Sequence, residues 1–342
     1  MKNISSLGLF AGLLLAVPTG CSGDDGTTST TAAGTDDTAG DGSETPTDGA
    51  DDGASETAGP SDDSSGGTPG ECPGIGGAGE VGGECGAPGD CASGVCLVFA
   101  DVPAGGGECV ETPADCNTRV IGGVYDFETG GRAGGTNVVV AAALQAATGP
   151  ATATPIVEGV TDGDGHFDVT SEMPIMAQIG IVALVSGDGF YLTATGIASP
   201  NDDSSYDVGN PTHQWWAVPT GALTAWSDAL AMDAEIGALE GVLPLGDEGG
   251  VVGLTRDGAT GDAVGGAVVV PEDPDGSSAI VRYLQDDDTW GPDATGSSGI
   301  FVIINPSLAE EFHVEVDGAT VSGTGTAGSA SGAIFTLIMN VE

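Results

Sequence analysis

Short runs of β-branched and aromatic residues, separated by turns rich in glycine and aspartate, fill the chain from Arg119 onwards. Such residues pack well on a pleated sheet, and Gly and Asp supply the backbone conformations that tight turns need. The pattern therefore predicts β-strands joined by short turns. The strands expected in the first part of this region are 120–126, 138–140, 156–160, 166–169 and 178–185.

Two segments of this region occur twice, in the same order. Residues 129–140 contain a Thr-Gly turn and end in three valines, and residues 260–270 repeat both features. Residues 161–167, with an acidic Gly-rich turn, match residues 295–301, which have serines at the acidic positions. Because both matches keep nearly the same offset, the sequence predicts an internal duplication.

The order of these motifs resembles that of carboxypeptidase regulatory-like domains: a strand, a Thr-Gly turn, Gly-small-x-Val-x-Val, Thr-Asp-x-x-Gly-x-Phe and a further strand. The second copy departs from this order by a long insertion at 272–292. The resemblance implies an all-β fold of two tandem transthyretin-like Greek-key β-sandwiches. It also implies non-catalytic modules that bind, stabilise or space.

The segment between the copies contains one predicted helix and the densest aromatic cluster of the chain. Apolar residues recur at helical spacing from Thr220, the expected N-cap, to Ala234, and Gly237 is the expected stop. Just before it lie Trp215 and Trp216. The pair has two interpretations: a stacking platform for a sugar or peptide ligand, or buried packing of the connector against a sandwich, which is the commoner use of large aromatic residues.

An apolar run at residues 7–17 follows Lys2 and is too short for a membrane span, which takes roughly 20 residues. The run is typical of a signal peptide. The small residues before Cys21 resemble a bacterial lipobox, although Pro18 stands where the motif usually has an aliphatic residue. We therefore expect lipidation of Cys21 and anchoring in the outer membrane, on its surface or periplasmic face. The alternative is a secreted protein in which Cys21 is incidental.

Residues 22–71 consist mainly of Gly, Ser, Thr, Ala and Asp, with thirteen acidic residues and no basic one. Such a segment has too little apolar surface to offset the entropy of ordering, so we expect a disordered linker. The whole chain has 51 acidic and five basic residues, for a formal net charge of -46. This charge excludes nucleic acid as a partner, because phosphates require cationic side chains, and it favours solubility.

Six further cysteines lie in a glycine-rich stretch with few large apolar residues. A core this small needs covalent support, and an exported chain with an even number of cysteines favours disulfides, here three of unknown connectivity. Zinc is the alternative, but the close C-x2-C pairs of zinc sites are absent. The six are Cys72, Cys85, Cys91, Cys96, Cys109 and Cys116.

Motifs of the common hydrolases are absent from the sequence. There is no G-x-S-x-G, and none of His166, His213 and His313 begins an H-E-x-x-H or H-x-x-E zinc motif. We therefore expect no enzymatic activity and no resident cofactor.

Calcium is the one cation that the sequence leaves open. Asp162 and Asp164 in their glycine turn, or the three aspartates at 286–288, supply the carboxylate oxygens that calcium prefers. The alternative for Asp162 and Asp164 is turn formation, since Asp-Gly is favoured in such turns without any ion.

These observations predict six segments. They are a signal peptide at 1–21, a linker at 22–71, a Cys-rich domain at 72–116, a β-sandwich at 117–199, a connector with one helix at 200–246 and a second β-sandwich at 247–342. The expected protein is a non-enzymatic surface lipoprotein with a structural, adhesive or spacer role, and the membrane is its first partner. The alternative is a carbohydrate- or peptide-binding accessory whose partner is a cell-wall or surface polysaccharide or a protein.

Overall fold

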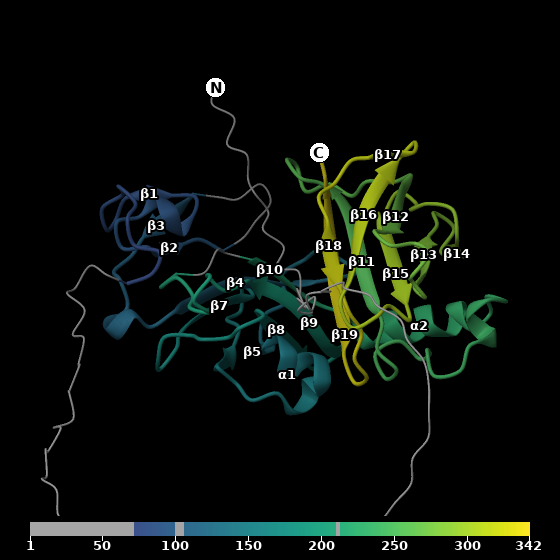
Figure 1. Ribbon diagram of the computed structural model, residues 1–342, viewed down its shortest axis with the longest axis horizontal. Coiled ribbons are helices and arrows are strands. Elements are labelled where there is room, and N and C mark those ends of the chain that lie inside the picture. Colours follow the sequence, from purple (N-terminus) through teal and green to yellow (C-terminus); the bar gives the residue numbers. More distant parts are fainter. Residues whose placement is uncertain (1–71, 100–105, 210–212) are drawn as a thin grey trace, which may run out of the picture. The chain divides into compact units, whose positions relative to one another are not determined.

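The computed structural model describes residues 72–99, 106–209 and 213–342, all within one compact unit of the chain (Figure 1). The predicted signal peptide, with Cys21, and the predicted linker at 22–71 lie outside the described residues. Strands dominate the described part, which confirms the expected predominance of β-structure. In this part of the chain, no helix combines the length and the apolar character that a membrane crossing needs.

The first module places two layers of strands around one core. One sheet has the order β10 (His213–Ala217), β4 (Arg119–Asp126), β7 (His166–Thr170). The facing strands have the order β9 (Phe190–Ala198), β8 (Ile181–Gly187), β5 (Asn137–Ala142), β6 (Val157–Val160). A short helix, α1 (Ala143–Thr148), and a 3-10 turn, η3 (Pro150–Thr152), follow β5. Both layers bury apolar side chains in the core, among them Val120, Val138, Phe167, Ile181 and Trp215.

The second module is built in the same way. One set of strands has the order β14 (Trp290–Gly291), β13 (Ile280–Leu284), β15 (Ile300–Ile304), β11 (Val251–Asp257), β19 (Ile334–Val341). The other sheet contains β12 (Ala267–Pro271), β16 (Glu310–Val316) and β17 (Ala319–Thr320), with β18 (Gly325–Ala327) also paired to β16. The core between them includes Val269, Tyr283, Phe301, Phe312 and Leu337.

The two modules have the same strand pairing. The strand before each Thr-Gly turn, β4 or β11, lies between an antiparallel neighbour (β7 or β15) and a parallel neighbour (β10 or β19). The strand after each turn, β5 or β12, pairs antiparallel with β8 or β16. The duplication predicted from the sequence is therefore present in the hydrogen-bonded sheets.

One continuous sheet joins the modules. β19 of the second module pairs in parallel with β9 of the first, with Ile334 opposite Thr193 and Phe335 opposite Ala194. The resulting nine-stranded sheet runs from β14 at one edge to β6 at the other. Nothing in the expected tandem arrangement anticipates this shared sheet.

The predicted connector at 200–246 contributes a strand to the first module. β10 pairs with β4 over five residues, so the module extends beyond the predicted boundary at 199. β9 also follows the strand expected to be the module's last. The predicted helix is present as α2 (Thr220–Leu230) but is shorter, and Pro219 rather than Thr220 takes the N-cap position. A 3-10 turn, η4 (Ile236–Ala238), comes after it.

The Cys-rich region is a small three-stranded sheet with two 3-10 turns. Its elements are β1 (Glu84–Cys85), η1 (Pro88–Asp90), β2 (Cys96–Leu97), β3 (Gly107–Cys109) and η2 (Ala114–Cys116). The region packs on the first module, where Val95 forms a buried cluster with Ile121 of β4 and with Val208. Phe99 stacks on His166 of β7, with the ring centroids 3.8 Å apart.

Candidate functional site

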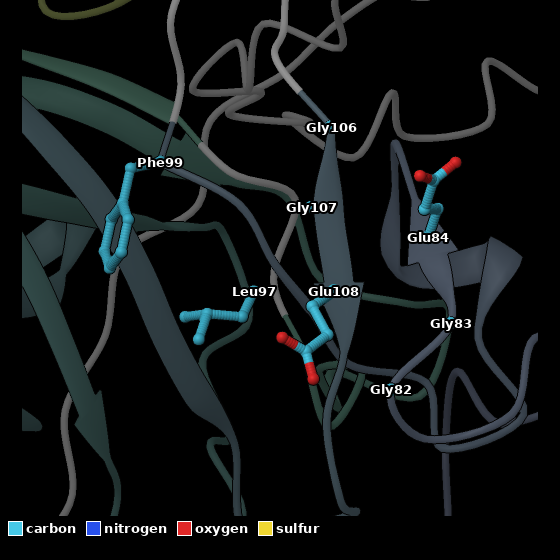
Figure 2. Close-up of a pocket in the computed structure, with 8 residues that line it drawn as sticks. All are labelled: Gly82, Gly83, Glu84, Leu97, Phe99, Gly106, Gly107 and Glu108. Carbon is cyan, nitrogen blue, oxygen red and sulfur yellow. The ribbon is translucent and has the colours of Figure 1, made fainter.

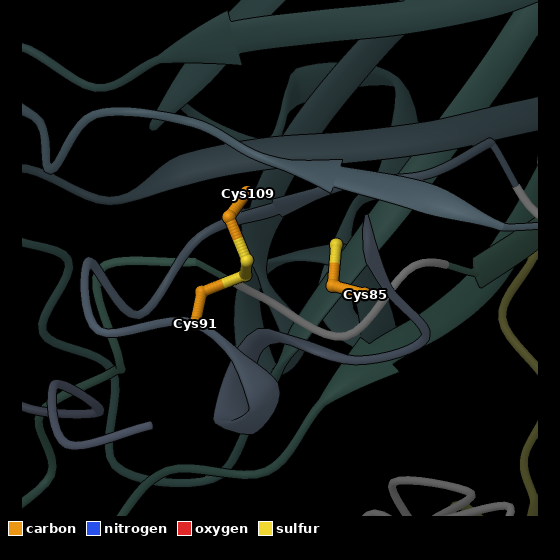
Figure 3. Close-up of side chains that lie close together, drawn as sticks. All are labelled: Cys85, Cys91 and Cys109. Carbon is orange, nitrogen blue, oxygen red and sulfur yellow. A yellow bond between two sulfur atoms is a disulfide. The ribbon is translucent and has the colours of Figure 1, made fainter. Parts of the chain in front are cut away.

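The six cysteines of the Cys-rich region form three disulfides, as expected. The pairs are Cys72–Cys116, Cys85–Cys96 and Cys91–Cys109. The sulfurs of Cys85, Cys91 and Cys109 lie within 4.8 Å of one another, a grouping of three potential metal ligands in the described part of the chain (Figure 3). All three are bonded to another sulfur, so none is the thiolate that zinc requires. The structure therefore favours the disulfide interpretation over the zinc site.

A shallow hollow lies on the Cys-rich region, between its strands. Four glycines and four larger side chains line it (Figure 2). Glu84 and Glu108 stand opposite each other on β1 and β3, but Figure 2 shows their carboxylates pointing apart. The apolar lining comes from Leu97 and Phe99. The ionisable groups of the lining are the carboxylates of Glu84 and Glu108, and because these point apart the hollow does not bring two acid–base groups together.

Both tryptophans singled out as ligand contacts are buried. Trp215 is 0% exposed and belongs to the core of the first module, where its ring covers Gly122. Trp216 is 5% exposed and points to the opposite side of β10, into a second core shared with α2, β11, β15 and β19. Neither ring offers a free face to a sugar. This burial favours the packing interpretation of the pair over the ligand-binding one.

The Asp162 carboxylate is used by its own turn. Its Oδ1 accepts the backbone N–H groups of Asp164 and His166, each at 2.9 Å. The bond from His166 is the main cause that lowers the pKa of Asp162 below its usual value. Gly165 has φ +75°, which a residue with a side chain rarely adopts. These contacts favour turn formation over calcium binding.

The aspartates at 286–288 have a comparable structural role. Asp286 Oδ1 accepts the backbone N–H of Ser297 at 2.7 Å, in the turn that precedes β15, and this bond lowers the pKa of Asp286. Asp287 Oδ1 accepts the hydroxyl of Thr289 at 2.6 Å. The second module thus replaces the acidic turn of the first with an aspartate supplied from its insertion.

Two arginines form ion pairs that hold segments of the fold together. Arg119 Nε and Nη2 donate to the two carboxylate oxygens of Asp168, each at 2.8 Å, across β4 and β7. Arg282 of β13 is buried and donates to Asp233 at 2.8 Å and to Glu235 at 2.6 Å. The second arginine fixes the segment after α2 to the second module.

Further polar side chains contact each other across strands. Arg256 of β11 donates to Asn340 Oδ1 of β19 at 2.9 Å and also to Gln214 of β10, and burial lowers its pKa. His313 Nδ1 lies 2.9 Å from Glu272 Oε1, across β16 and the end of β12. These contacts connect neighbouring strands and the two modules.

The residues that sequence reasoning missed are buried threonines. Thr161 Oγ1 accepts the backbone N–H of Thr136, and Thr295 Oγ1 accepts that of Ala267, both at 3.0 Å. Thr161 Oγ1 also donates to the C=O of Ala133 at 3.2 Å, and Thr295 Oγ1 donates to the C=O of Val264 at 3.0 Å. These carbonyls lie in the loops before β5 and β12. The only available signal was the repetition of the threonines, since both begin the second duplicated motif.

Comparisons with known proteins find matches among solved structures alone. No protein-family model matches the chain, and no curated protein matches it. Among solved structures, the shaft pilin SpaA of Lactobacillus rhamnosus GG is 12% identical, with a TM-score of 0.20 over 66% of this chain and 98% of that chain. A variant of the major pilin subunit of Bacillus cereus is 8% identical, with a TM-score of 0.21 over 66% and 99%.

A streptococcal ancillary pilin is 12% identical, with a TM-score of 0.19 over 69% of this chain and 66% of that chain. All three are pilins, and all three similarities have TM-scores near 0.2. Scores this low do not establish a shared fold. The chain is therefore similar to pilins only at the level of these weak structural matches.

Proposed function

We propose that this chain is a non-enzymatic surface lipoprotein with a structural, adhesive or spacer role. In this proposal Cys21 carries the lipid, the acidic linker at 22–71 separates the folded part from the outer membrane, and the fused pair of modules is the part displayed. The protein has no resident cofactor in this account.

The observation that carries the proposal is the use of polar side chains inside the fold. The buried threonines, the Arg282 ion pairs and the turn aspartates all bond to neighbouring segments of the described chain. Groups committed to such contacts are positioned for stability rather than for exchange with a substrate. The two carboxylates that line the described hollow point apart and form no acid–base pair, which agrees with this interpretation.

We further propose that both modules are carboxypeptidase regulatory-like domains of transthyretin-like topology. The support is that each duplicated motif occupies the same place in both modules. The Thr-Gly turn joins β4 to β5 and β11 to β12, and the second motif leads into β7 and β15. A shared pairing scheme in both copies is what descent from one such domain requires.

Detergent partition of whole-cell extracts tests the lipid anchor. We expect the wild-type protein in the detergent phase of a Triton X-114 separation and Cys21→Ser in the aqueous phase, because acyl chains contribute about 0.8 kcal/mol for each buried methylene. Metabolic labelling with an alkyne fatty acid provides the second readout. A wild-type protein that stays in the aqueous phase and takes up no label contradicts the proposal.

One observation supports the alternative of a peptide-binding accessory. β6 forms the edge of the nine-stranded sheet, and Val160 at its end is 62% exposed. The open edge of β12 pairs with no strand, but the Tyr283 hydroxyl occupies it by binding both the N–H and the C=O of Val269, at 2.8 Å and 3.2 Å. β6 is therefore one edge at which a peptide can add a strand.

A whole-cell photo-crosslinking pull-down separates the two functions. Amine-reactive reagents do not serve here, because Lys2 is the only lysine and lies in the predicted signal peptide. If the protein is a spacer, we expect the pull-down to capture no single ligand in a saturable way. Saturable capture of a peptide or polysaccharide that is lost when Glu158→Pro blocks the β6 edge would favour the accessory function instead.

A further inference from the structure

The disulfide between Cys72 and Cys116 closes a ring at the start of the first module. It brings the two Cα atoms to 5.3 Å, although 44 positions separate them in sequence. The ring encloses the two other disulfides and the hollow between β1 and β3. The chain that arrives from the linker and the chain that continues into β4 therefore meet at one covalent junction.

Backbone contacts fix the chain directly after this junction. Thr118 is fully buried, its N–H donates to Ser171 Oγ at 3.0 Å, and its C=O accepts the N–H of Ser171 at 2.9 Å. The N–H of Arg119 donates to the C=O of Val208 at 2.7 Å. β4 then runs between β7 and β10 as the middle strand of its sheet.

We propose that the Cys72–Cys116 disulfide is a force bypass. Tension that reaches Cys72 from the linker passes through the sulfur–sulfur bond to Cys116 and into β4, and residues 73–115 stay unstretched. The inference takes the source of tension, a membrane anchor, from the proposed function. The bypass itself depends only on the described disulfide.

The physical reason is the difference in length between the two covalent paths. Along the backbone, 44 positions extend to about 150 Å when taut, at roughly 3.4 Å for each residue. The disulfide holds the same two Cα atoms 5.3 Å apart, so it becomes taut first and the longer path stays slack. The Cys-rich region is thereby presented at the cell surface without carrying the load.

The load then enters a strand that is well placed to resist it. The hydrogen bonds from β4 to its neighbours lie across the strand direction, so a pull along β4 must shear several of them together. The pair of bonds from Arg119 to Asp168 adds a charge-assisted contact at the end of β4 where the force enters.

Single-molecule pulling on the full chain tests the bypass. The chain carries Cys21→Ser, so no membrane is needed, and protein handles are fused to both ends. The readout is the fully extended length after both modules have unfolded, which does not depend on the stability of a variant. Thiol titration before each experiment establishes which disulfides are present.

We expect reduction of the protein to lengthen it by about 150 Å, the length of the released ring. Cys72→Ser with Cys116→Ser is expected to lengthen the oxidised protein on the order of 90 Å, because the two inner disulfides still shorten the path. The matched control is Cys85→Ser with Cys96→Ser, which removes a disulfide inside the ring and is expected to leave the oxidised length unchanged.

Two results would overturn the bypass. One is an oxidised wild-type length that does not increase on reduction, and the other is an increase in the Cys85→Ser, Cys96→Ser control. Either would mean that the load passes through residues 73–115. Because these measurements use no membrane, they stand or fall independently of the detergent partition that tests the lipid anchor.

Discussion

Thr195 of β9 and Thr336 of β19 join the two modules through their side chains, with the Oγ1 atoms 2.8 Å apart. The N–H of Trp216 donates to Thr195 Oγ1 at 3.3 Å, and Thr336 Oγ1 lies 3.3 Å from the C=O of Ala194. A chain of hydrogen bonds therefore runs from β10 through β9 to β19. It lies where the duplicated modules share one sheet.

Removal of either hydroxyl should weaken this junction. Thr195→Val leaves the Trp216 N–H unpaired, so we expect a loss of about 1–3 kcal/mol in the free energy of unfolding, against about 1 kcal/mol for Thr336→Val. Urea denaturation measures both, and the double variant gives their coupling. Thr148→Val, at an exposed hydroxyl in α1, is the control and should change stability by less than about 0.5 kcal/mol. Additive effects of the two junction variants would contradict the link.

Burial of Trp215 against Gly122 gives a second prediction. A Cβ on Gly122 would lie 2.5 Å from the indole, so Gly122→Ala forces the ring to move and should cost about 1–3 kcal/mol. Gly131→Ala is the control, because its Cβ would meet nothing closer than 3.4 Å. Thermal unfolding compares the two variants. Equal stabilities would mean that the Trp215 ring is not packed on β4.

The Asp233 carboxylate should make the free energy of unfolding depend on pH in the acid range. The hydrogen bond from Arg282 lowers the pKa of this carboxyl from 3.8 to about 2. A carboxyl whose pKa is lower in the folded state than in the unfolded state stabilises the fold at pH values above its unfolded-state pKa. This stabilisation is lost as the pH falls through the folded-state pKa. We therefore expect Asp233→Asn to be less stable than the wild type above about pH 4, and the difference to shrink towards pH 2.

Urea midpoints at a series of pH values measure this difference. Asp228→Asn removes the same charge from the exposed face of α2 and serves as the control for net charge, which changes strongly in so acidic a chain. A difference between wild type and Asp233→Asn that grows below pH 4 would contradict the assigned ion pair.

The Tyr283 hydroxyl should protect the open edge of β12. Burial raises the pKa of Tyr283 to about 12, so the hydroxyl stays protonated and bonds to both backbone groups of Val269. Tyr283→Phe leaves that N–H unpaired, and we expect a loss of about 1–3 kcal/mol together with faster aggregation from the exposed edge. Tyr206→Phe loses one bond, to the Ala177 carbonyl, and should cost less. Light scattering and urea denaturation measure the two effects.

The sequence predicted the duplicated β-modules because turn chemistry and β-branched runs are local signals. It did not predict that β9 and β19 pair, because strand pairing between distant segments leaves no local pattern. The insertion at 272–292 was visible, but not that its strand β13 joins β15 and leaves β12 with an open edge.

The tryptophan pair owes its burial to strand pairing that the sequence did not predict. In β10, Trp215 and Trp216 alternate, so each enters a different core, and this two-residue period is the ordinary pattern of a strand buried on both faces. The sequence left packing and ligand binding both open, because the segment was expected to be a connector rather than a strand of the first module. The disulfides were predicted correctly because an even number of cysteines, in a chain expected to be exported, favours pairing.

Hydrogen exchange in the native protein decides whether the two modules open together, as one unit, or separately. The amides to follow are those of Ala194 in β9 and Phe335 in β19, with Val138 and Val314 reporting on the interiors of the first and second modules. We expect all four amides to exchange through one common opening with the same denaturant dependence. Exchange of one module's amides while the other module stays protected would show two independent domains and contradict this expectation.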